Sequence, residues 1–121
     1  MKYIVIHYET EEGERPLDDF LGRQEAKARV AFDRRVDLLE AGDLPIKRPY
    51  IDTLHGGIKE LRFKVNKNQY RIFLFFFFKD KIMFTHGIIK KTDKVPDVEI
   101  NRALKYKNDF EVRYKEGRYI I

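Results

Sequence analysis

Cysteine is absent from this sequence of 121 residues, and histidine occurs only three times. Without cysteine the chain forms no disulfide bond and no thiolate metal site, although this absence does not name a cellular compartment. The three histidines, His7, His55 and His86, are scattered and do not stand at the spacing of metal ligands. We therefore expect no metal site and no cofactor.

Long hydrophobic runs are also missing. The most apolar stretch, Ile72–Phe78, ends after seven residues at Lys79 and Asp80, whereas a membrane-spanning helix needs about 20 apolar residues. Near the N-terminus, a short apolar stretch over residues 3–6 is followed by His7 and several glutamates, with no small-residue cleavage site of a signal peptide. The sequence predicts a cytoplasmic protein that has no membrane partner.

The chain is rich in both apolar and charged side chains. Hydrophobic residues make up 43% and aromatic residues 14%, which suffices for a hydrophobic core although 37% of the residues are charged. No internal repeat and no Gly/Ser-rich linker interrupts the sequence. We expect a single domain over residues 1–121.

The charge is distributed unevenly along the chain. Residues 1–61 carry 10 basic and 13 acidic side chains, whereas residues 62–121 carry 15 basic and 7 acidic ones. The second half therefore has a net charge of +8 and attracts polyanions. Solvated lysine-rich faces are common, so this charge alone does not establish a nucleic-acid partner.

The first half predicts one strand and then helices. Lys2–Tyr8 is short, β-branched and aromatic, which is typical of a strand. One or two helical turns should begin at Pro16, and Arg23–Ala41 carries one apolar stripe at helical spacing. Gly42 follows at the position where a left-handed C-terminal cap is usual, and a loop is expected over residues 54–57.

The second half predicts an antiparallel meander. Apolar and charged residues alternate in Lys59–Val65, so one face of this strand should be core and the other exposed. Two-residue turns at Lys67-Asn68 and Lys79-Asp80 would connect it to Tyr70–Phe78 and then to Lys81–Ile89. The middle strand is apolar at nearly every position, which indicates a strand covered on both faces.

A last amphipathic helix is expected from about Pro96 to about Lys115. The order strand, helices, meander, helix predicts an α+β fold. Its sheet would be small, mostly antiparallel and four-stranded, with the N-terminal helices packed on one face. A C-terminal helix would complete the fold.

Three motifs follow one another in the second half. They are ELR at residues 60–62, YRIF at 70–73 and HGIIKKT at 86–92, followed by Lys94, Pro96 and Glu99. With these motifs at this spacing, the stretch from about Gly56 to Phe110 resembles the phage-derived, HigB-like toxins of the RelE/ParE superfamily.

The resemblance implies a RelE-like fold and the toxin half of a type II toxin–antitoxin pair. Such toxins are typically endoribonucleases that cut messenger RNA, often on the translating ribosome. The implied partners are messenger RNA, the ribosome and an antitoxin, expected to be a helix-turn-helix protein encoded adjacently. A basic toxin should bind an acidic or amphipathic antitoxin segment. We expect that segment along the helix Arg23–Ala41 and the sheet face that this helix does not cover, reaching towards Arg62, Arg71 and Lys90.

The residues themselves are compatible with RNA cleavage without a metal ion. Attack by a 2′-hydroxyl needs a proton acceptor, positive charge on the phosphate and a proton donor for the leaving oxygen. We predict a catalytic set of Arg62, Arg71, His86 and Lys91. The residues predicted to bind RNA phosphates are Lys59, Lys64, Lys90 and Lys94, and Glu60 is predicted to orient Arg62.

These residues also have structural interpretations. Arg62 could pair with Glu60, and Lys90 and Lys91 could be a solvated strand end. His86 has the strand parity of Ile82, Phe84 and Ile88, so a core imidazole is at least as well supported as a proton-transfer group.

Departures from the related toxins leave the general base unassigned. RelE-type relatives carry lysines where this chain has Ile58, Lys59 and Glu60, and a tyrosine after the last basic cluster, where this chain has none. Two other functions remain open: a non-catalytic or degenerate RNA-binding or regulatory protein, and a gyrase inhibitor of the ParE type.

Overall fold

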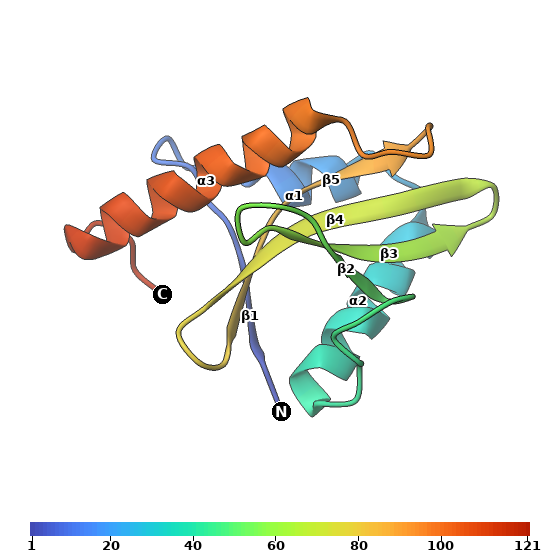
Figure 1. The fold of residues 1–121 in the computed structure, drawn as a ribbon, viewed down its shortest axis with the longest axis horizontal. Helices are drawn as coiled ribbons and strands as arrows, with labels where there is room; N and C mark the ends of the chain where they lie inside the picture. Colours follow the sequence, from blue (N-terminus) through green and yellow to red (C-terminus); the bar gives the residue numbers. More distant parts are fainter.

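One mixed sheet forms the centre of the protein, shown in a computed structural model that describes all of residues 1–121 (Figure 1). Its strands are β1 (Ile4–His7), β2 (Ile51–Thr53), β3 (Lys59–Val65), β4 (Asn68–Phe77) and β5 (Lys81–Lys90). They lie in the order β1-β5-β4-β3-β2. β1 runs parallel to β5, and the other neighbours are antiparallel. The predicted α+β class and meander are confirmed.

The sheet has five strands, so the prediction of four was wrong by one edge strand. The extra strand, β2, pairs only Ile51–Thr53 with Lys59–Leu61 of β3. Three residues are too few to show a strand periodicity in sequence. The β3–β4 turn is also displaced by one residue, to Asn66 and Lys67, because Asn66 takes the left-handed conformation (φ 55°) that asparagine tolerates.

The helices are α1 (Pro16–Gly22), α2 (Ala26–Ala41) and α3 (Asp97–Lys115). Gly42 caps α2 in the left-handed conformation (φ 81°), as predicted. α2 starts three residues later than predicted because Glu25 is extended and separates it from α1. None of the three helices is long and apolar enough to cross a bilayer.

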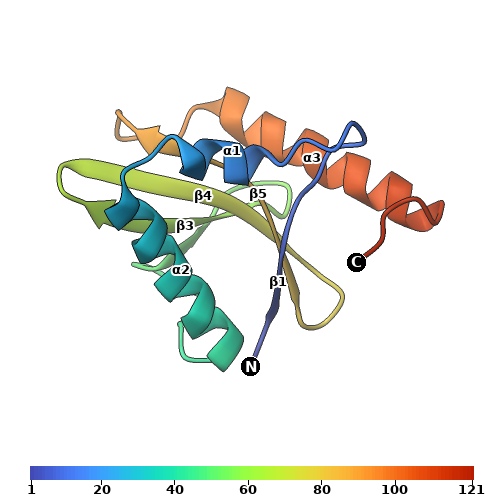
Figure 2. The same cartoon turned by 180° about the vertical axis from the view of Figure 1, so that it is seen from behind.

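Helices cover both faces of the sheet, with α1 and α2 on one face and α3 on the other (Figures 1 and 2). The core under α1 and α2 contains Leu17, Phe32 and Leu74, and the core under α3 contains Phe73, Phe75 and Phe110. Successive residues of β4 point into these two cores in turn. This confirms the interpretation of the apolar run as a strand covered on both faces.

A register shift interrupts the β4–β5 pairing between Ile72 and Leu74. Ile82 and Phe84 lie in the core under α1 and α2, whereas His86 stacks on Phe73 under α3. The irregularity therefore breaks the simple alternation that groups His86 with Ile82 and Phe84.

Candidate nucleic-acid site

Arg62 and Arg71 face each other directly across β3 and β4. Alternation along the two strands places both side chains, with that of Glu60, on the α3 face of the sheet. The β3–β4 hairpin extends past the start of α3 in Figure 1, so the helix does not cover this part of the face. The predicted meeting of the two guanidinium groups is therefore present in the fold.

Glu60 joins the two arginines into one charged cluster. Its Oε1 atom lies 3.2 Å from Nε of Arg71 and 3.7 Å from Nε of Arg62. The side chains of Glu60 and Arg71 are 4% and 3% exposed, whereas that of Arg62 is 24% exposed. Glu60 therefore does not lie on an exposed face of β3, as the alternating pattern predicted, because its end of the strand is covered.

The cluster is incompletely hydrogen-bonded. Arg71 donates from Nη1 to the Tyr70 carbonyl (3.0 Å) and from Nη2 to Oε1 of Gln69 (3.1 Å). Three buried atoms, Oε2 of Glu60 and the Nε atoms of both arginines, have no hydrogen-bond partner of acceptable geometry. Buried polar atoms are rarely left unpaired, and exceptions point to a bound water, an ion or a functional role.

Burial also perturbs the protonation of the cluster. Burial raises the pKa of the Glu60 carboxyl above its ordinary value, although Arg71 and Arg62 act in the opposite direction. Burial likewise lowers the pKa of Arg71, which Glu60 partly offsets. A carboxylate whose charge is disfavoured beside two cations is a potential proton acceptor.

Two hollows flank Arg62, and it lines both of them. The hollow towards α3 also contains Glu60, Lys90 and Lys94. The other, at the hairpin, contains Arg71, Gln69 and Lys64. The structure therefore brings three of the four predicted phosphate-binding lysines, Lys64, Lys90 and Lys94, around the arginine pair.

Lys59 and Lys91 do not join this group. Lys59 donates a hydrogen bond to the Thr53 hydroxyl (2.8 Å) and has the strand parity of Leu61, on the opposite face of the sheet from Arg62. Lys91 is exposed just beyond the end of β5 and lines neither hollow.

His86 is in the core, with 1% of its surface exposed. Its Nδ1 lies 3.1 Å from the Thr85 hydroxyl and its Nε2 lies 3.2 Å from Oε1 of Glu99. Burial, helped by the charge of Arg102, lowers the pKa of His86 to about 3. The imidazole is therefore neutral near pH 7, with one ring nitrogen donating and the other accepting.

The hollow towards α3 also contains residues that the sequence did not single out, notably Arg48 and Asp52. Nη2 of Arg48 lies 2.7 Å from Oδ2 of Asp52, and this contact holds the pKa of the Asp52 carboxyl below its ordinary value. Asp52 belongs to the short strand β2, whose position beside Glu60 depends on strand pairing. In the sequence, the one feature that indicates this ion pair is that Arg48 and Asp52 are four residues apart.

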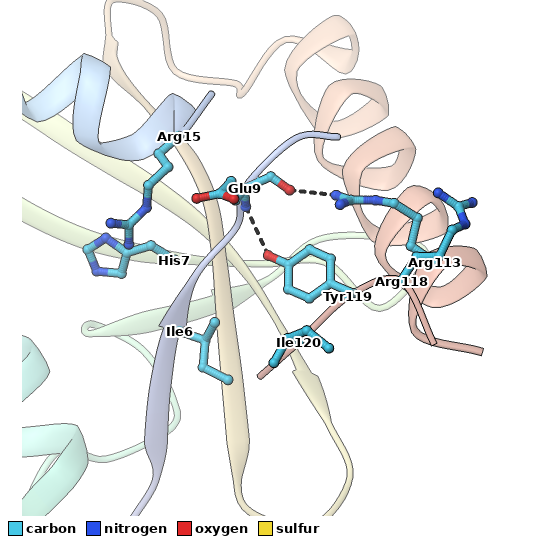
Figure 3. A pocket seen from close by; sticks show the side chains of 8 residues that line it. All are labelled: Ile6, His7, Glu9, Arg15, Arg113, Arg118, Tyr119 and Ile120. Atoms are coloured by element: carbon cyan, nitrogen blue, oxygen red, sulfur yellow. Dashed lines mark hydrogen bonds between the residues drawn. The ribbon is translucent and has the colours of Figure 1, made fainter. Parts of the chain in front are cut away.

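A separate hollow lies between β1 and the C-terminal segment (Figure 3). Arg15, Arg113 and Arg118 line it, but each is already paired with a carboxylate. The Glu9 backbone closes one side, donating from N–H to the Tyr119 hydroxyl (2.9 Å) and accepting from Arg113 (2.5 Å). These contacts tie chain segments together, so we place the candidate site at Arg62 and Arg71.

Comparison with known proteins identifies the family of this chain. No curated protein matches the sequence. The family described as "Phage derived protein Gp49-like (DUF891)" matches residues 19–108, a stretch that contains α2 and the strands β2 to β5. The match spans about three-quarters of the 121 residues and includes all three motifs. The chain therefore belongs to the phage-derived Gp49-like family.

Proposed function

We propose that this protein is the HigB-like toxin of a type II toxin–antitoxin pair and acts as a metal-independent endoribonuclease on messenger RNA. The main support is the incompletely bonded cluster of Arg62, Arg71 and Glu60 beside a group of lysines. Family membership supports the toxin assignment and with it an antitoxin partner.

In the proposed reaction, a carboxylate removes the proton of a 2′-hydroxyl. That oxygen attacks the adjacent phosphorus, the bond from phosphorus to the 5′-oxygen breaks, and the leaving oxygen takes a proton from water while the carboxyl group returns its proton to solvent. The products are a 2′,3′-cyclic phosphate and a 5′-hydroxyl end. Arg62, with Arg71 behind it, would stabilise the negative charge that grows on the phosphate oxygens.

The other site residues receive supporting roles in this proposal. Glu60 orients both guanidinium groups and is the carboxylate of the cluster best suited to accept the proton, because burial raises its pKa whereas Arg48 lowers the pKa of Asp52. Lys64, Lys90 and Lys94 would bind neighbouring phosphates. The buried His86 would act by positioning the sheet and Glu99, and Lys91 would contact more distant RNA.

The test is to induce the protein alone and map the ends of cellular transcripts by primer extension. We expect growth arrest with new 5′-hydroxyl ends inside translated messages, and loss of those ends in an Arg62→Ala variant. Arrest with intact transcripts would overturn the assignment as a ribonuclease and would favour a gyrase inhibitor.

A non-catalytic RNA-binding protein is the second candidate. The observation that favours it is the burial of Arg71, Glu60 and His86, which leaves few titratable groups exposed at the cluster. Purified protein would distinguish the two, because a binder shifts labelled RNA in a gel without forming cyclic phosphate ends.

A further inference from the structure

The outer edge of β3 is open at the end of the strand, beyond Arg62. β2 pairs with β3 only as far as Leu61, and β3 continues to Val65. The amide of Arg62 already donates outward to the Tyr50 carbonyl (2.9 Å). Because backbone groups alternate in direction along a strand, those of Lys64 point to the same outer side, beyond the last residue of β3 that pairs with β2.

An apolar groove lies beside this edge, between α2 and the end of β3. The groove has a volume of about 460 Å³. Small and β-branched side chains line it, namely Ala26, Val30, Ala31 and Val65. Val30 is 48% exposed, so its side chain is accessible to a ligand of the groove.

The rim of the groove is mainly basic. Lys27, Arg34, Arg35 and Lys64 line it, and the one carboxylate bound to a lining residue is that of Glu25, which accepts from Nδ2 of Asn66 (2.9 Å). The guanidinium of Arg35 is held 5.0 Å from the ring centroid of Phe63, so this cation has a fixed position at the rim. A ligand of this groove should therefore combine apolar side chains with negative charge.

Lys64 connects the groove to the candidate site. It lines the groove under α2 and also the hollow that contains Arg62 and Arg71. An occupant that pairs with Lys64 would therefore stand at the entrance to the arginine pair.

We propose that an acidic, amphipathic segment of a partner protein adds to the open edge of β3 as an extended strand and buries apolar side chains against Val30 and Val65. Strand addition supplies main-chain hydrogen bonds, and the groove supplies selectivity for side chains. An RNA backbone would satisfy the cations but would leave the apolar floor unused, so we favour a protein segment. The inference rests on the proposed function only in naming that partner as the antitoxin.

The experiment uses the full chain and a display library of short random peptides, with binding of the selected peptide measured by fluorescence anisotropy. We expect selected peptides to alternate acidic and apolar residues. Val30→Ser and Lys64→Glu should each weaken binding about tenfold. Binding should persist at roughly 0.5 M salt, because screening removes ionic contacts and leaves the apolar burial.

Two variants serve as matched controls. Val112→Ser changes a valine of similar exposure (44%) on α3, and Lys79→Glu reverses an exposed charge in the turn between β4 and β5. Both should bind the peptide like the parent chain. Circular dichroism of all four variants checks that each is folded.

Hydrogen exchange distinguishes strand addition from looser docking. The peptide should slow exchange of the Lys64 amide, and an unchanged amide would overturn strand addition. Failure to select any acidic peptide, or equal loss of binding in the control variants, would overturn the docking surface. If oligouridylate competes for the groove and also requires Val30, the surface belongs to RNA.

These binding measurements involve no RNA cleavage. A chain that binds the peptide but does not cut messages would refute the proposed function and leave the docking surface standing. A chain that cuts messages but selects no peptide would refute the docking surface and leave the proposed function standing.

Discussion

Glu60 and its two arginine neighbours combine a cost in stability with a potential use. All three side chains lose water when the strands pair, and three of their polar atoms gain no well-aligned hydrogen bond in return, although both Nε atoms lie near the Glu60 carboxylate. A buried ion pair is weak evidence of stabilisation, because desolvation opposes the Coulomb attraction. The cluster therefore adds little net stability, and its closely spaced positive charge is the feature on which the proposed function depends.

Removing Glu60 should nevertheless damage the fold. Glu60→Ala leaves the Arg71 guanidinium buried without a counter-charge, for which we expect a loss of about 3 kcal/mol or more in the free energy of unfolding. Urea denaturation measures it. The control is Glu111→Ala, which removes an exposed partner of Lys107 and should cost less than about 1 kcal/mol. Equal costs for both variants would contradict the account of the buried cluster.

Arg62, the more exposed arginine, is the better probe of RNA binding. Arg62→Ala should weaken binding of single-stranded RNA of any sequence while the protein stays folded. If Arg62 contacts one phosphate, the slope of log affinity against log salt should become shallower by about 0.7. Arg23→Ala, at an exposed position between α1 and α2, is the control and should keep the parent slope. An unchanged slope in the Arg62 variant would remove this residue from the proposed site.

The sequence predicted part of the site for physical reasons that can be named. Arg62 and Arg71 could be placed on one face of a hairpin from their strand parity, but the turn predicted at Lys67-Asn68 would set Arg71 opposite Lys64. The observed turn at Asn66-Lys67 sets it opposite Arg62. The burial of Glu60 could not be predicted, since it depends on the pairing with β2 and on side chains from distant segments. Asp52 was missed for the same reason: its three-residue strand has no local signal.

Packing of α1 on β5 depends on the glycine of the HGIIKKT motif. A Cβ atom at Gly87 would stand 2.7 Å from Cδ1 of Ile72 and 2.7 Å from Cδ2 of Phe20 on α1. Backbone conformation does not require glycine at this position, because its φ is not positive. Gly87 is therefore needed for the close approach of α1 to the sheet.

Gly87→Ala should displace α1 and destabilise the protein by about 1–3 kcal/mol through overpacking. Thermal unfolding followed by circular dichroism measures the loss. Gly22→Ala is the matched control, because a Cβ atom there meets nothing within 4 Å. A Gly87→Ala protein as stable as the control would show that Phe20 and Ile72 move aside without cost.

The helices and long strands could be predicted because each has a repeating apolar pattern and a recognisable end. α3 ends at Lys115, and α2 ends before Gly42, as the sequence indicated. The register shift between β4 and β5 has no such pattern. On β4 it falls within the apolar run, and on β5 the two residues Thr85 and His86 stand against Phe73 alone. Its main effect is the orientation of His86, which local sequence does not determine.

The stability of the whole protein should depend on pH through His86. The pKa of His86 in the folded chain is about 3, against an ordinary value of 6.5. Between these values the unfolded chain binds more protons, so the free energy of unfolding should fall as the pH is lowered from 6.5 towards 3. His86 lowers the free energy of unfolding by up to about 1.4 kcal/mol for each pH unit of acidification in that range.

Urea denaturation at a series of pH values measures this dependence. His86→Gln should lower stability at neutral pH, because it disturbs the stacking on Phe73, but should also make the decline on acidification shallower. His55→Gln, in an exposed loop, is the control for loss of an imidazole and should keep the steeper decline. Parallel pH curves for the parent and the His86 variant would contradict the burial argument.

The pairing of β1 with β5 imposes an order on folding. Ile4 lies opposite Lys81 in a parallel pair, so a strand from the start of the chain can take its place only after the β3–β4–β5 meander has been synthesised. Contacts so distant in sequence slow folding, because a long loop must close before they form. Until β5 is available, β1 has no partner strand, and its apolar residues stay exposed during synthesis. A nascent chain of this protein should therefore depend on chaperones until β5 leaves the ribosome.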